Sequence, residues 1–345
     1  MPIDRLPETL QALYAELLDQ SILAEAEAVA RQLPAPGTFV SKEIKGGVYW
    51  YLQRVEAGRK RQYYLGPQSE PLARWMSEVV AHRRASVADE RRRSELVDML
   101  LAGGATGEIT SVGRVLQVLA ESGVFRLGGV LVGTQAFHCY SNVLGARFGA
   151  LAQRTQDVDV AQDRSIPVAL EAGTVPRPIE ELLQAADPAF LAVPSLDPRE
   201  PTTVFKVRGR DLRVDLLTPW REGDGEGPVQ LPYLKAAAQP LPFLDYLLTD
   251  VRQAVVLVGV GALVRVPDPG RFVFHKLWLS GRRPVTHQTK ARKDLRQAQE
   301  VARVLLEDRP RDLDRARAAL EPARRRAIAE AVAQLPDDLR PSLSP

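Results

Sequence analysis

Hydrophobic and polar positions recur with different periods along the chain, and each period predicts a kind of element. Residues 7–33 place leucines and an isoleucine at helical spacing opposite an acidic face, which predicts one amphipathic helix. Residues 38–66 combine β-branched and aromatic runs with the turn signals GG and AG, which predicts a three-stranded meander. A long charged helix over about 69–101 and a shorter helix over 111–122 are expected to follow.

Between residues 125 and 217 the pattern changes to mixed α/β. We expect FRLGGVLVG as a buried strand, TQAFHCYSNVLGARF as a helix, TQDVDVA as a strand, and VFKVRG with DLRVDLLT as a hairpin. Short strands follow, and from residue 268 the pattern is helical and Arg-rich up to a Pro-rich tail that we expect to fray.

These elements predict an α/β (α+β) fold with a mixed sheet and flanking helices. An N-terminal accessory region over residues 1–104 would hold the first helix, the meander and the long helix. A core with the mixed sheet would span residues 105–266, and a C-terminal helical region would span residues 267–345.

Composition and charge narrow the class of protein. The 46 Lys and Arg nearly balance the 43 Asp and Glu, so the net charge of +3 does not by itself indicate a nucleic-acid partner. The single cysteine, Cys139, excludes an internal disulfide framework and fits a reducing compartment. The N-terminus lacks the apolar core of a signal peptide and no run is apolar enough to span a membrane, so we expect a cytoplasmic protein without a membrane partner.

Candidate chemistry begins at the segment TQDVDV. Side chains two apart on a strand point the same way, so Asp157 and Asp159 share one face while Val158 and Val160 enter the core. Two carboxylates this close repel each other unless a cation lies between them, and Mg²⁺ prefers such oxygen ligands.

A third carboxylate follows in LRVDL, where Asp215 is flanked by apolar residues on another predicted strand. Asp211 is the alternative if the register differs. Three carboxylates can hold two metal ions roughly 3.5–4 Å apart, one beside an attacking hydroxyl and one beside a leaving oxygen.

Upstream, the strand VLV runs into a helix through Gly133 and Thr134. A glycine at such a junction lets backbone N–H groups and the helix N-terminus approach a phosphate, and the Thr134 hydroxyl adds a donor. Gly133 could equally serve only the packing of the helix on the strand.

Together, the strand, the Gly-Thr at a helix start, the Asp-x-Asp and the later strand aspartate resemble the polymerase beta nucleotidyltransferase superfamily. LVGTQAFHCYSNVLGARF, TQDVDVA, VPDPGRFVFHKLWLSGRR and KARKDLRQA are similar to a bacterial nucleotidyltransferase-like branch akin to the toxins of type IV toxin/antitoxin and abortive-infection systems. The likeness covers about residues 125–305. Gly133-Thr134 stands where the superfamily has Gly-Gly or Gly-Ser, and 23 residues separate Gly133 from Asp157, a gap that matches the toxin-like branch.

The resemblance implies a magnesium- or manganese-dependent enzyme that moves an NMP from an NTP to a hydroxyl. Asp157, Asp159 and Asp215 would be the metal-binding and catalytic residues. Lys276 would face the triphosphate, and the remaining nucleotide-binding residues would be Gly133, Thr134, Thr155, Lys293 and Asp294. The acceptor could be an RNA or tRNA end, a protein hydroxyl or a small molecule, and a toxin would have a cognate antitoxin. The alternative is a catalytically degenerate fold that serves as a nucleic-acid-binding or regulatory module.

Other residues have plainer interpretations. Lys276 could be a solvated helix lysine, His138 and Cys139 are expected to be packing residues, and His275 a hydrogen-bonded structural histidine. The meander interleaves tyrosines and a tryptophan with lysines and arginines. That pattern fits either a grip on unpaired nucleic acid or a small sheet with aromatics on its buried face and charges on its wet edge.

Overall fold

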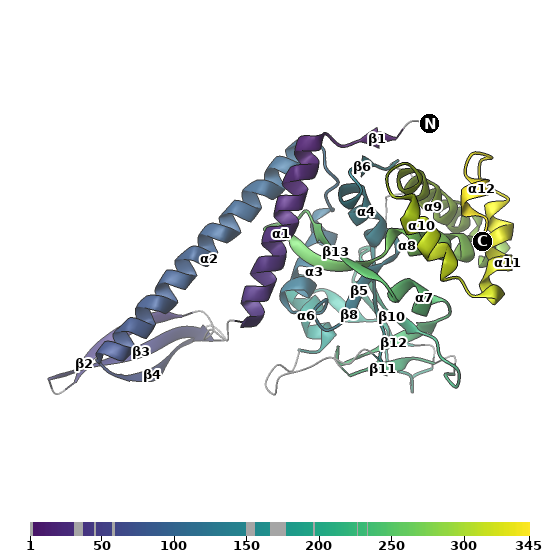
Figure 1. The fold of residues 1–345 in the computed structure, drawn as a ribbon. Helices are drawn as coiled ribbons and strands as arrows, with labels where there is room; N and C mark the ends of the chain where they lie inside the picture. The colour runs from purple at the N-terminus through teal and green to yellow at the C-terminus, as the bar shows by residue number, and fades with distance from the viewer. Residues whose placement is uncertain are drawn as a thin grey trace. The chain divides into compact units, whose positions relative to one another are not determined.

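The computed structural model describes residues 3–345 except 31–36, 45, 57–58, 150–155, 166–176, 196, 226 and 233. Contacts divide the chain into two compact units (Figure 1), the first comprising Met1–Ser21 and Leu96–Pro345 and the second Ile22–Glu95. Helices α1 (Glu8–Ala30) and α2 (Glu70–Ala102) have residues in both units. The predicted mixed α/β class is confirmed, and the three-part division at residues 104 and 266 stays a prediction.

The first unit is built on a mixed sheet with the strand order β11-β12-β10-β7-β5, and β9 pairs with both β10 and β8. Strands β7 and β12 run parallel to β10, whereas the other pairs are antiparallel. The hairpin predicted from VFKVRG and DLRVDLLT is confirmed as β9 and β10. The strands are β5 (Gly129–Val132), β7 (Asp157–Gln162), β8 (Phe190–Ala192), β9 (Val204–Val207), β10 (Arg213–Pro219), β11 (Val229–Leu231) and β12 (Ala236–Leu241).

Alternation along β7 and β10 decides which face of the sheet is buried. Val158 and Val160 of β7 are at most 1% exposed, and so are Val214 and Leu216 of β10. Their burial turns the intervening residues of both strands to the opposite face.

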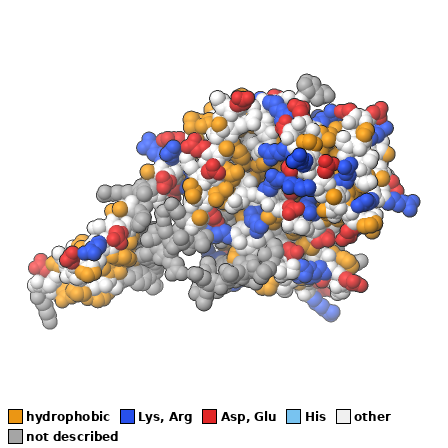
Figure 2. Space-filling model, viewed as in Figure 1, with side chains coloured by type: hydrophobic (Ala, Val, Ile, Leu, Met, Phe, Trp, Pro, Cys, Tyr) orange, Lys and Arg blue, Asp and Glu red, His pale blue; other side chains and the backbone are white. Residues whose placement is uncertain are grey.

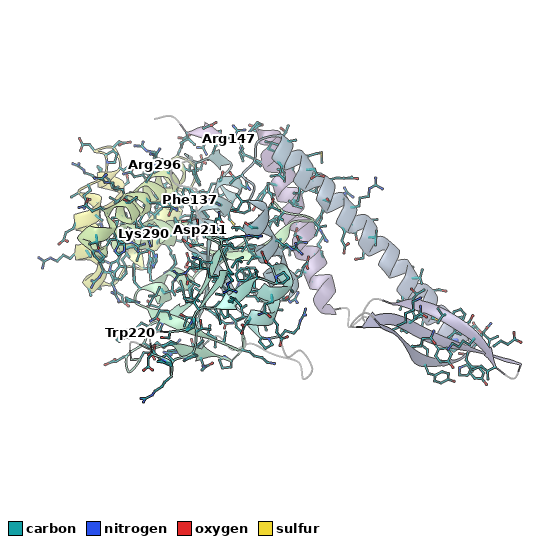
Figure 3. All side chains as sticks on the ribbon, turned by 180° about the vertical axis from the view of Figure 1, so that it is seen from behind. Phe137, Arg147, Asp211, Trp220, Lys290 and Arg296 are labelled. Carbon is teal, nitrogen blue, oxygen red and sulfur yellow. The ribbon has the colours of Figure 1, made fainter. Side chains whose placement is uncertain are left out.

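The buried strand residues join one core with the helices of the first unit. Phe137 of α4 (Gly133–Val143) lies in this core (Figure 3). Its ring stacks on Phe148 at 4.7 Å and on Phe272 at 6.4 Å. The helix predicted for TQAFHCYSNVLGARF ends at Val143, because the chain turns at Gly145 with φ +63°. Two further helices in this core are α3 (Thr110–Glu121) and α6 (Ile179–Ala186).

The central helix of the C-terminal region is α8 (Pro269–Arg282). Asp268 caps it by accepting hydrogen bonds from the backbone N–H groups of Gly270 and Arg271, and a proline occupies the first turn. Most of α8 is buried because other helices pack around it. These are α9 (Gln288–Asp308), α10 (Pro310–Ala318) and α11 (Pro322–Val332).

The C-terminal tail does not fray, contrary to the prediction. Leu335, Leu339 and Leu343 are at most 2% exposed, and the last helix, α12 (Arg340–Leu343), includes one of them. Apolar anchors at every fourth position dock the tail on the core, which outweighs its proline content. The remaining elements of this unit are β1 (Asp4–Arg5), β6 (Ala146–Arg147), α7 (Leu244–Leu248), β13 (Val251–Val256), β14 (Ala262–Pro267) and the 3₁₀ helix η1 (Val285–His287).

The second unit contains the predicted meander, which is confirmed as the antiparallel sheet β2-β3-β4. Its strands are β2 (Thr38–Ile44), β3 (Gly47–Glu56) and β4 (Arg59–Pro67). The sheet packs on α2, where Phe39 meets Trp75 edge to face at 5.7 Å.

Charged side chains of both signs are interspersed over the face of the molecule drawn in Figure 2, in keeping with the small net charge. None of the helices in the described ranges combines the length and the hydropathy that a membrane span requires.

Candidate active site

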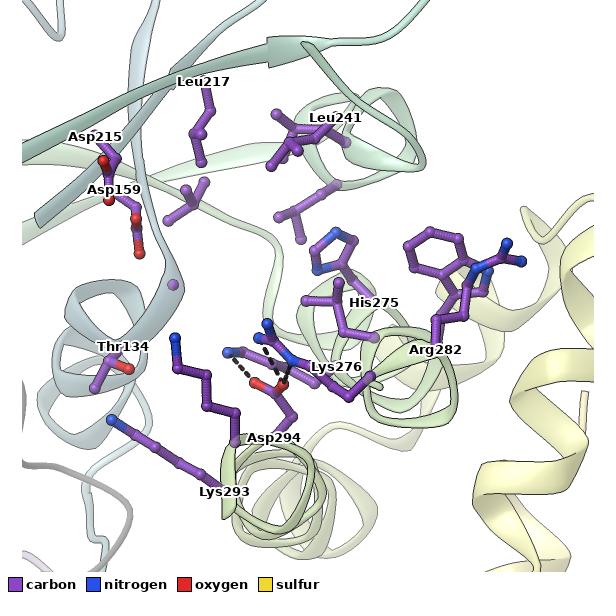
Figure 4. Close-up of a pocket in the computed structure, with 18 of the residues that line it drawn as sticks. Thr134, Asp159, Asp215, Leu217, Leu241, His275, Lys276, Arg282, Lys293 and Asp294 are labelled. Atoms are coloured by element: carbon purple, nitrogen blue, oxygen red, sulfur yellow. Dashed lines mark hydrogen bonds and ion pairs between the residues drawn. The ribbon is translucent and has the colours of Figure 1, made fainter. Parts of the chain in front are cut away.

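A cavity of about 580 Å³ lies in the first unit between the sheet and the helices α8 and α9. Its walls come from the ends of β5, β7, β10 and β12, the first turn of α4, and α7, α8 and α9. Figure 4 shows that Asp159 and Asp215 face the cavity from one side and Lys276 and Lys293 from another. The predicted residues that line it are Gly133, Thr134, Asp157, Asp159, Asp215, Lys276, Lys293 and Asp294. Thr155 lies outside the described residues.

Three carboxylates reach this cavity from neighbouring strands. Asp159 of β7 pairs in register with Asp215 of β10, and Asp157 pairs with Arg213. Paired residues on adjacent strands point to the same face and lie about 4.8 Å apart at the backbone. The register therefore selects Asp215 over Asp211 as the neighbour of the Asp-x-Asp pair.

The close approach and burial of these acids shift their pKa values. Burial, helped by the charges of Asp215 and Asp157, raises the pKa of Asp159 to about 6. Burial also raises the pKa of Asp215, although Arg213 opposes this shift by donating to its Oδ1 atom from Nε and from the guanidinium terminus, both at 2.8 Å. The site is thus an accumulation of negative charge that a cation would relieve.

Gly133 occupies the junction between β5 and α4, as predicted, and its conformation requires glycine. Its φ is +65°, and a Cβ atom placed there would lie 2.2 Å from Oδ2 of Asp159. The backbone at the start of α4 therefore touches the carboxylate.

The start of α4 is held in place by two glutamines. The amide of Gln135 donates to the backbone oxygen of Asp157 at 3.3 Å, and the amide of Gln297 donates to Oγ1 of Thr134 at 3.4 Å. Both glutamines are almost fully buried. They tie the glycine junction to β7 on one side and to α9 on the other.

Lys276 is not a solvated helix lysine, because its side chain is 7% exposed and donates to Oδ1 of Asp294 at 2.7 Å. Arg283 donates to the other oxygen of Asp294 at 3.0 Å. Burial raises the pKa of Asp294, but Lys276 and Arg283 outweigh it and hold the pKa below its ordinary value. Asp294 therefore acts as an anchor that positions two cations.

Two more lysines of α9 line the cavity. Burial and the neighbouring Lys276 lower the pKa of Lys293, and the charge of Lys290 favours the ionised form of Asp215. Sequence reasoning missed Lys290, although it precedes Lys293 and Asp294 by three and four positions and so shares their helix face. It also missed Arg213, which is two strand positions before Asp215 and therefore on the same face.

Comparison with known proteins assigns the chain to a family. The Nucleotidyltransferase family model matches residues 110–321, which is more than half of the chain and includes all the described cavity residues predicted above. The chain belongs to this nucleotidyltransferase family. A second model, for a domain of unknown function (DUF6788), matches residues 3–74. No curated protein and no solved structure matches the chain.

The donor set of this nucleotidyltransferase domain can be tested against a divalent cation. Among the described residues, no group of three His, Cys, Asp or Glu side chains is placed to hold an ion by itself. Mg²⁺, however, is usually held by one or two carboxylates together with substrate phosphates. The charge of Asp215 disfavours ionisation of Asp159, so a cation held by these two carboxylates fits that mode of binding.

The far end of the cavity is apolar and aromatic. Leu217, Leu241, Leu244, Leu247 and Trp278 line it, and the guanidinium of Arg282 lies 5.1 Å from the Trp278 ring centroid. The nucleotidyltransferase cavity thus has a charged half and an apolar half, as a nucleotide has.

His275 lies in the apolar half and is not the hydrogen-bonded structural histidine that we expected. It stacks on Phe243 at 5.7 Å, and among the described residues no group hydrogen-bonds to its imidazole. Burial, with the charge of Lys276, lowers the pKa of His275 to about 3, so the ring is neutral. Of the two other packing residues expected, Cys139 is buried in the core, whereas His138 pairs with Glu108 away from the cavity.

Proposed function

We propose that this nucleotidyltransferase moves a nucleoside monophosphate from an NTP to a hydroxyl acceptor in a magnesium-dependent reaction. One observation supports the proposal most. A single cavity joins carboxylates from two adjacent strands, a glycine-led helix start and a set of lysines. Phosphoryl transfer depends on such positioning and charge stabilisation more than on covalent chemistry by the protein.

Asp159 and Asp215 would hold the divalent cation, Mg²⁺ or Mn²⁺, together with the substrate phosphates, and Asp157 would add a third carboxylate from the same face of β7. When bound, the cation supplies neutralisation of phosphate charge and makes a coordinated hydroxyl more acidic. Both donor atoms of Arg213 meet Oδ1 of Asp215, and no described group binds Oδ2. Oδ2 of Asp215 is therefore available to orient the acceptor hydroxyl and take its proton.

The triphosphate would lie between α4 and α9. Val132 provides no side-chain cap at the start of α4, which leaves the backbone N–H groups of Gly133 and Thr134 for phosphate oxygens. Lys290 and Lys293 face the same space from α9. The acceptor oxygen forms a bond to the α-phosphorus, the bond from that phosphorus to the bridging oxygen breaks, and pyrophosphate leaves.

The base would enter the apolar half of the cavity. There the leucines and Trp278 provide apolar surface, and the neutral imidazole of His275 offers one donor and one acceptor. An apolar pocket with a few convergent polar groups is the usual way a protein orients a small ligand.

The acceptor is proposed to be an RNA end, as in the toxin-like branch that the sequence resembles. A protein hydroxyl and a small molecule are the other acceptors, and a cognate antitoxin would be the partner of a toxin. A nucleic-acid-binding module without turnover is the second candidate function, since the carboxylates could persist in a fold that has lost its activity.

The test is incubation of the protein with each α-phosphate-labelled NTP, Mg²⁺, and total RNA or total protein. We expect label in the RNA fraction, loss of labelling with EDTA, and recovery with Mg²⁺ or Mn²⁺. Asp157→Asn should abolish labelling, whereas Asp211→Asn, an exposed acid just before β10, should not.

Other outcomes separate the alternatives. Label in protein or in a small molecule would reassign the acceptor. If no NTP supports transfer but the protein binds RNA, the protein is a nucleic-acid-binding module without turnover rather than an enzyme. If expression of the wild-type protein arrests growth and expression of Asp159→Ala does not, the protein acts as a toxin.

A further inference from the structure

The sheet of the second unit has two chemically different faces. Its registers pair Lys42 with Tyr49 and Tyr51 with Tyr64, and cross-strand partners point to the same side. Lys60 pairs with Val55, four positions after Tyr51, and so lies on that side too. We call this side the tyrosine face: Lys42, Tyr49, Tyr51, Lys60 and Tyr64.

The opposite face of the sheet is the one that packs on α2. Phe39 pairs with Leu52, which is 3% exposed, and contacts Trp75 of α2. This is the buried aromatic face that one interpretation of the sequence expected. It leaves the three tyrosines without a part in the contact between the sheet and α2.

The tyrosines form an open cluster rather than a core. Tyr64 is 58% exposed, and its ring lies 5.5 Å from Tyr51 and 6.3 Å from Tyr49. A Cβ atom at Gly47 would lie 3.1 Å from Cε2 of Tyr49, so that ring lies against bare backbone. Exposed, mutually supported rings of this kind are platforms on which planar groups can stack.

The charge of the tyrosine face is of one sign. Lys42 is exposed, with its ammonium 4.9 Å from the Tyr51 ring centroid, and Lys60 is exposed as well. Glu43, an acidic residue of β2, pairs with Val48 and therefore points to the opposite face. Cations beside aromatic rings, without carboxylates, complement a polyanion whose bases are planar.

Polar groups for base edges lie on the same face. The amide nitrogen of Gln62 donates to Oε1 of Gln53 at 2.8 Å. That bond leaves the Gln62 carbonyl oxygen as an acceptor and the Gln53 amide as a donor. Unpaired bases, unlike the bases of a duplex, expose both their faces and their edges to such groups.

We propose that the tyrosine face binds single-stranded nucleic acid. Bases stack on Tyr51 and Tyr64, while Lys42 and Lys60 contact the phosphates. The inference stands apart from nucleotidyl transfer, because every group it uses belongs to the second unit.

The experiment measures binding of the full-length protein, without NTP, to a fluorescently labelled single-stranded RNA by anisotropy. Single-stranded DNA of the same sequence and the corresponding RNA duplex are the comparison probes. Because stacking on an aromatic side chain contributes substantially per base, Tyr64→Ala should raise the Kd about fivefold to a hundredfold, and Tyr64→Phe should stay within about twofold. A preference between the two single strands tells whether RNA or DNA is the natural ligand.

Charge is tested with a matched pair of variants. Lys42→Gln should weaken binding and lower the slope of log Kd against log salt by about one. Arg74→Gln removes the same charge from an exposed position on α2 and should leave the slope unchanged. Equal binding of duplex and single strands, an unaffected Kd in Tyr64→Ala, or no binding of either single strand at micromolar concentration would overturn the proposal.

Discussion

The substitution Gly133→Ala tests the geometry on which the active-site proposal depends. The added methyl group would lie 2.2 Å from Oδ2 of Asp159, whereas unstrained carbon–oxygen contacts are about 3.3 Å or longer. The carboxylate must therefore move by about 1 Å. The backbone meets a second cost, because φ at this position is +65° and an L-residue there loses about 1–2 kcal/mol.

These two effects act on different observables. A misplacement of about 1 Å in a reacting constellation can lower the rate about a hundredfold, which corresponds to about 2.7 kcal/mol in the activation barrier. We therefore expect kcat/KM for label transfer to fall by about that factor or more. The backbone cost should appear separately as a modest fall in the free energy of unfolding.

Gly209→Ala is the matched control. Its φ is +74°, and a Cβ atom there would meet nothing within 4 Å, so it has the backbone cost without the collision. The measurements are label transfer and denaturant unfolding of both variants and the wild type. If Gly133→Ala transfers label within threefold of Gly209→Ala, the contact with Asp159 does not organise the site and the reasoning fails.

Three further predictions concern stability. Asp294→Ala removes the partner of the buried Lys276 and should lower the free energy of unfolding by about 3–5 kcal/mol in denaturant titrations; a loss under 1 kcal/mol would mean that the lysine finds another partner. The pKa of His275 is about 3 in the folded state and about 6.5 in the unfolded chain, so between these values only the unfolded chain takes up a proton. The free energy of unfolding should therefore fall by up to about 1.4 kcal/mol for each pH unit below 6.5. In His275→Leu the free energy of unfolding should depend less on pH between pH 7 and 5 than in the wild type. The same pH dependence in both proteins would contradict the low pKa of His275. Tyr140→Phe deletes a buried 2.8 Å hydrogen bond to the Pro267 carbonyl and should cost about 1–3 kcal/mol, visible as a lower Tm; an unchanged Tm would refute it.

The sequence by itself determined the presentation of the carboxylates. Alternation along a strand is a local property, so Val158 and Val160 could enter the core only if Asp157 and Asp159 faced the other way. The same argument placed Asp215 opposite its apolar neighbours. The glycine at the junction of β5 and α4 was also predictable, because a strand that turns directly into a helix favours a residue that tolerates positive φ.

Only the tertiary structure decided which of these groups meet. The register that pairs Asp159 with Asp215 joins strands 56 positions apart, and no local pattern specifies such a pairing. Other helices pack around α8, and this packing brings Lys276 into contact with Asp294 of α9. The same packing places His275 in the apolar half of the cavity. The period of a strand or helix determines which face a side chain occupies, whereas long-range packing determines which residues it contacts on that face.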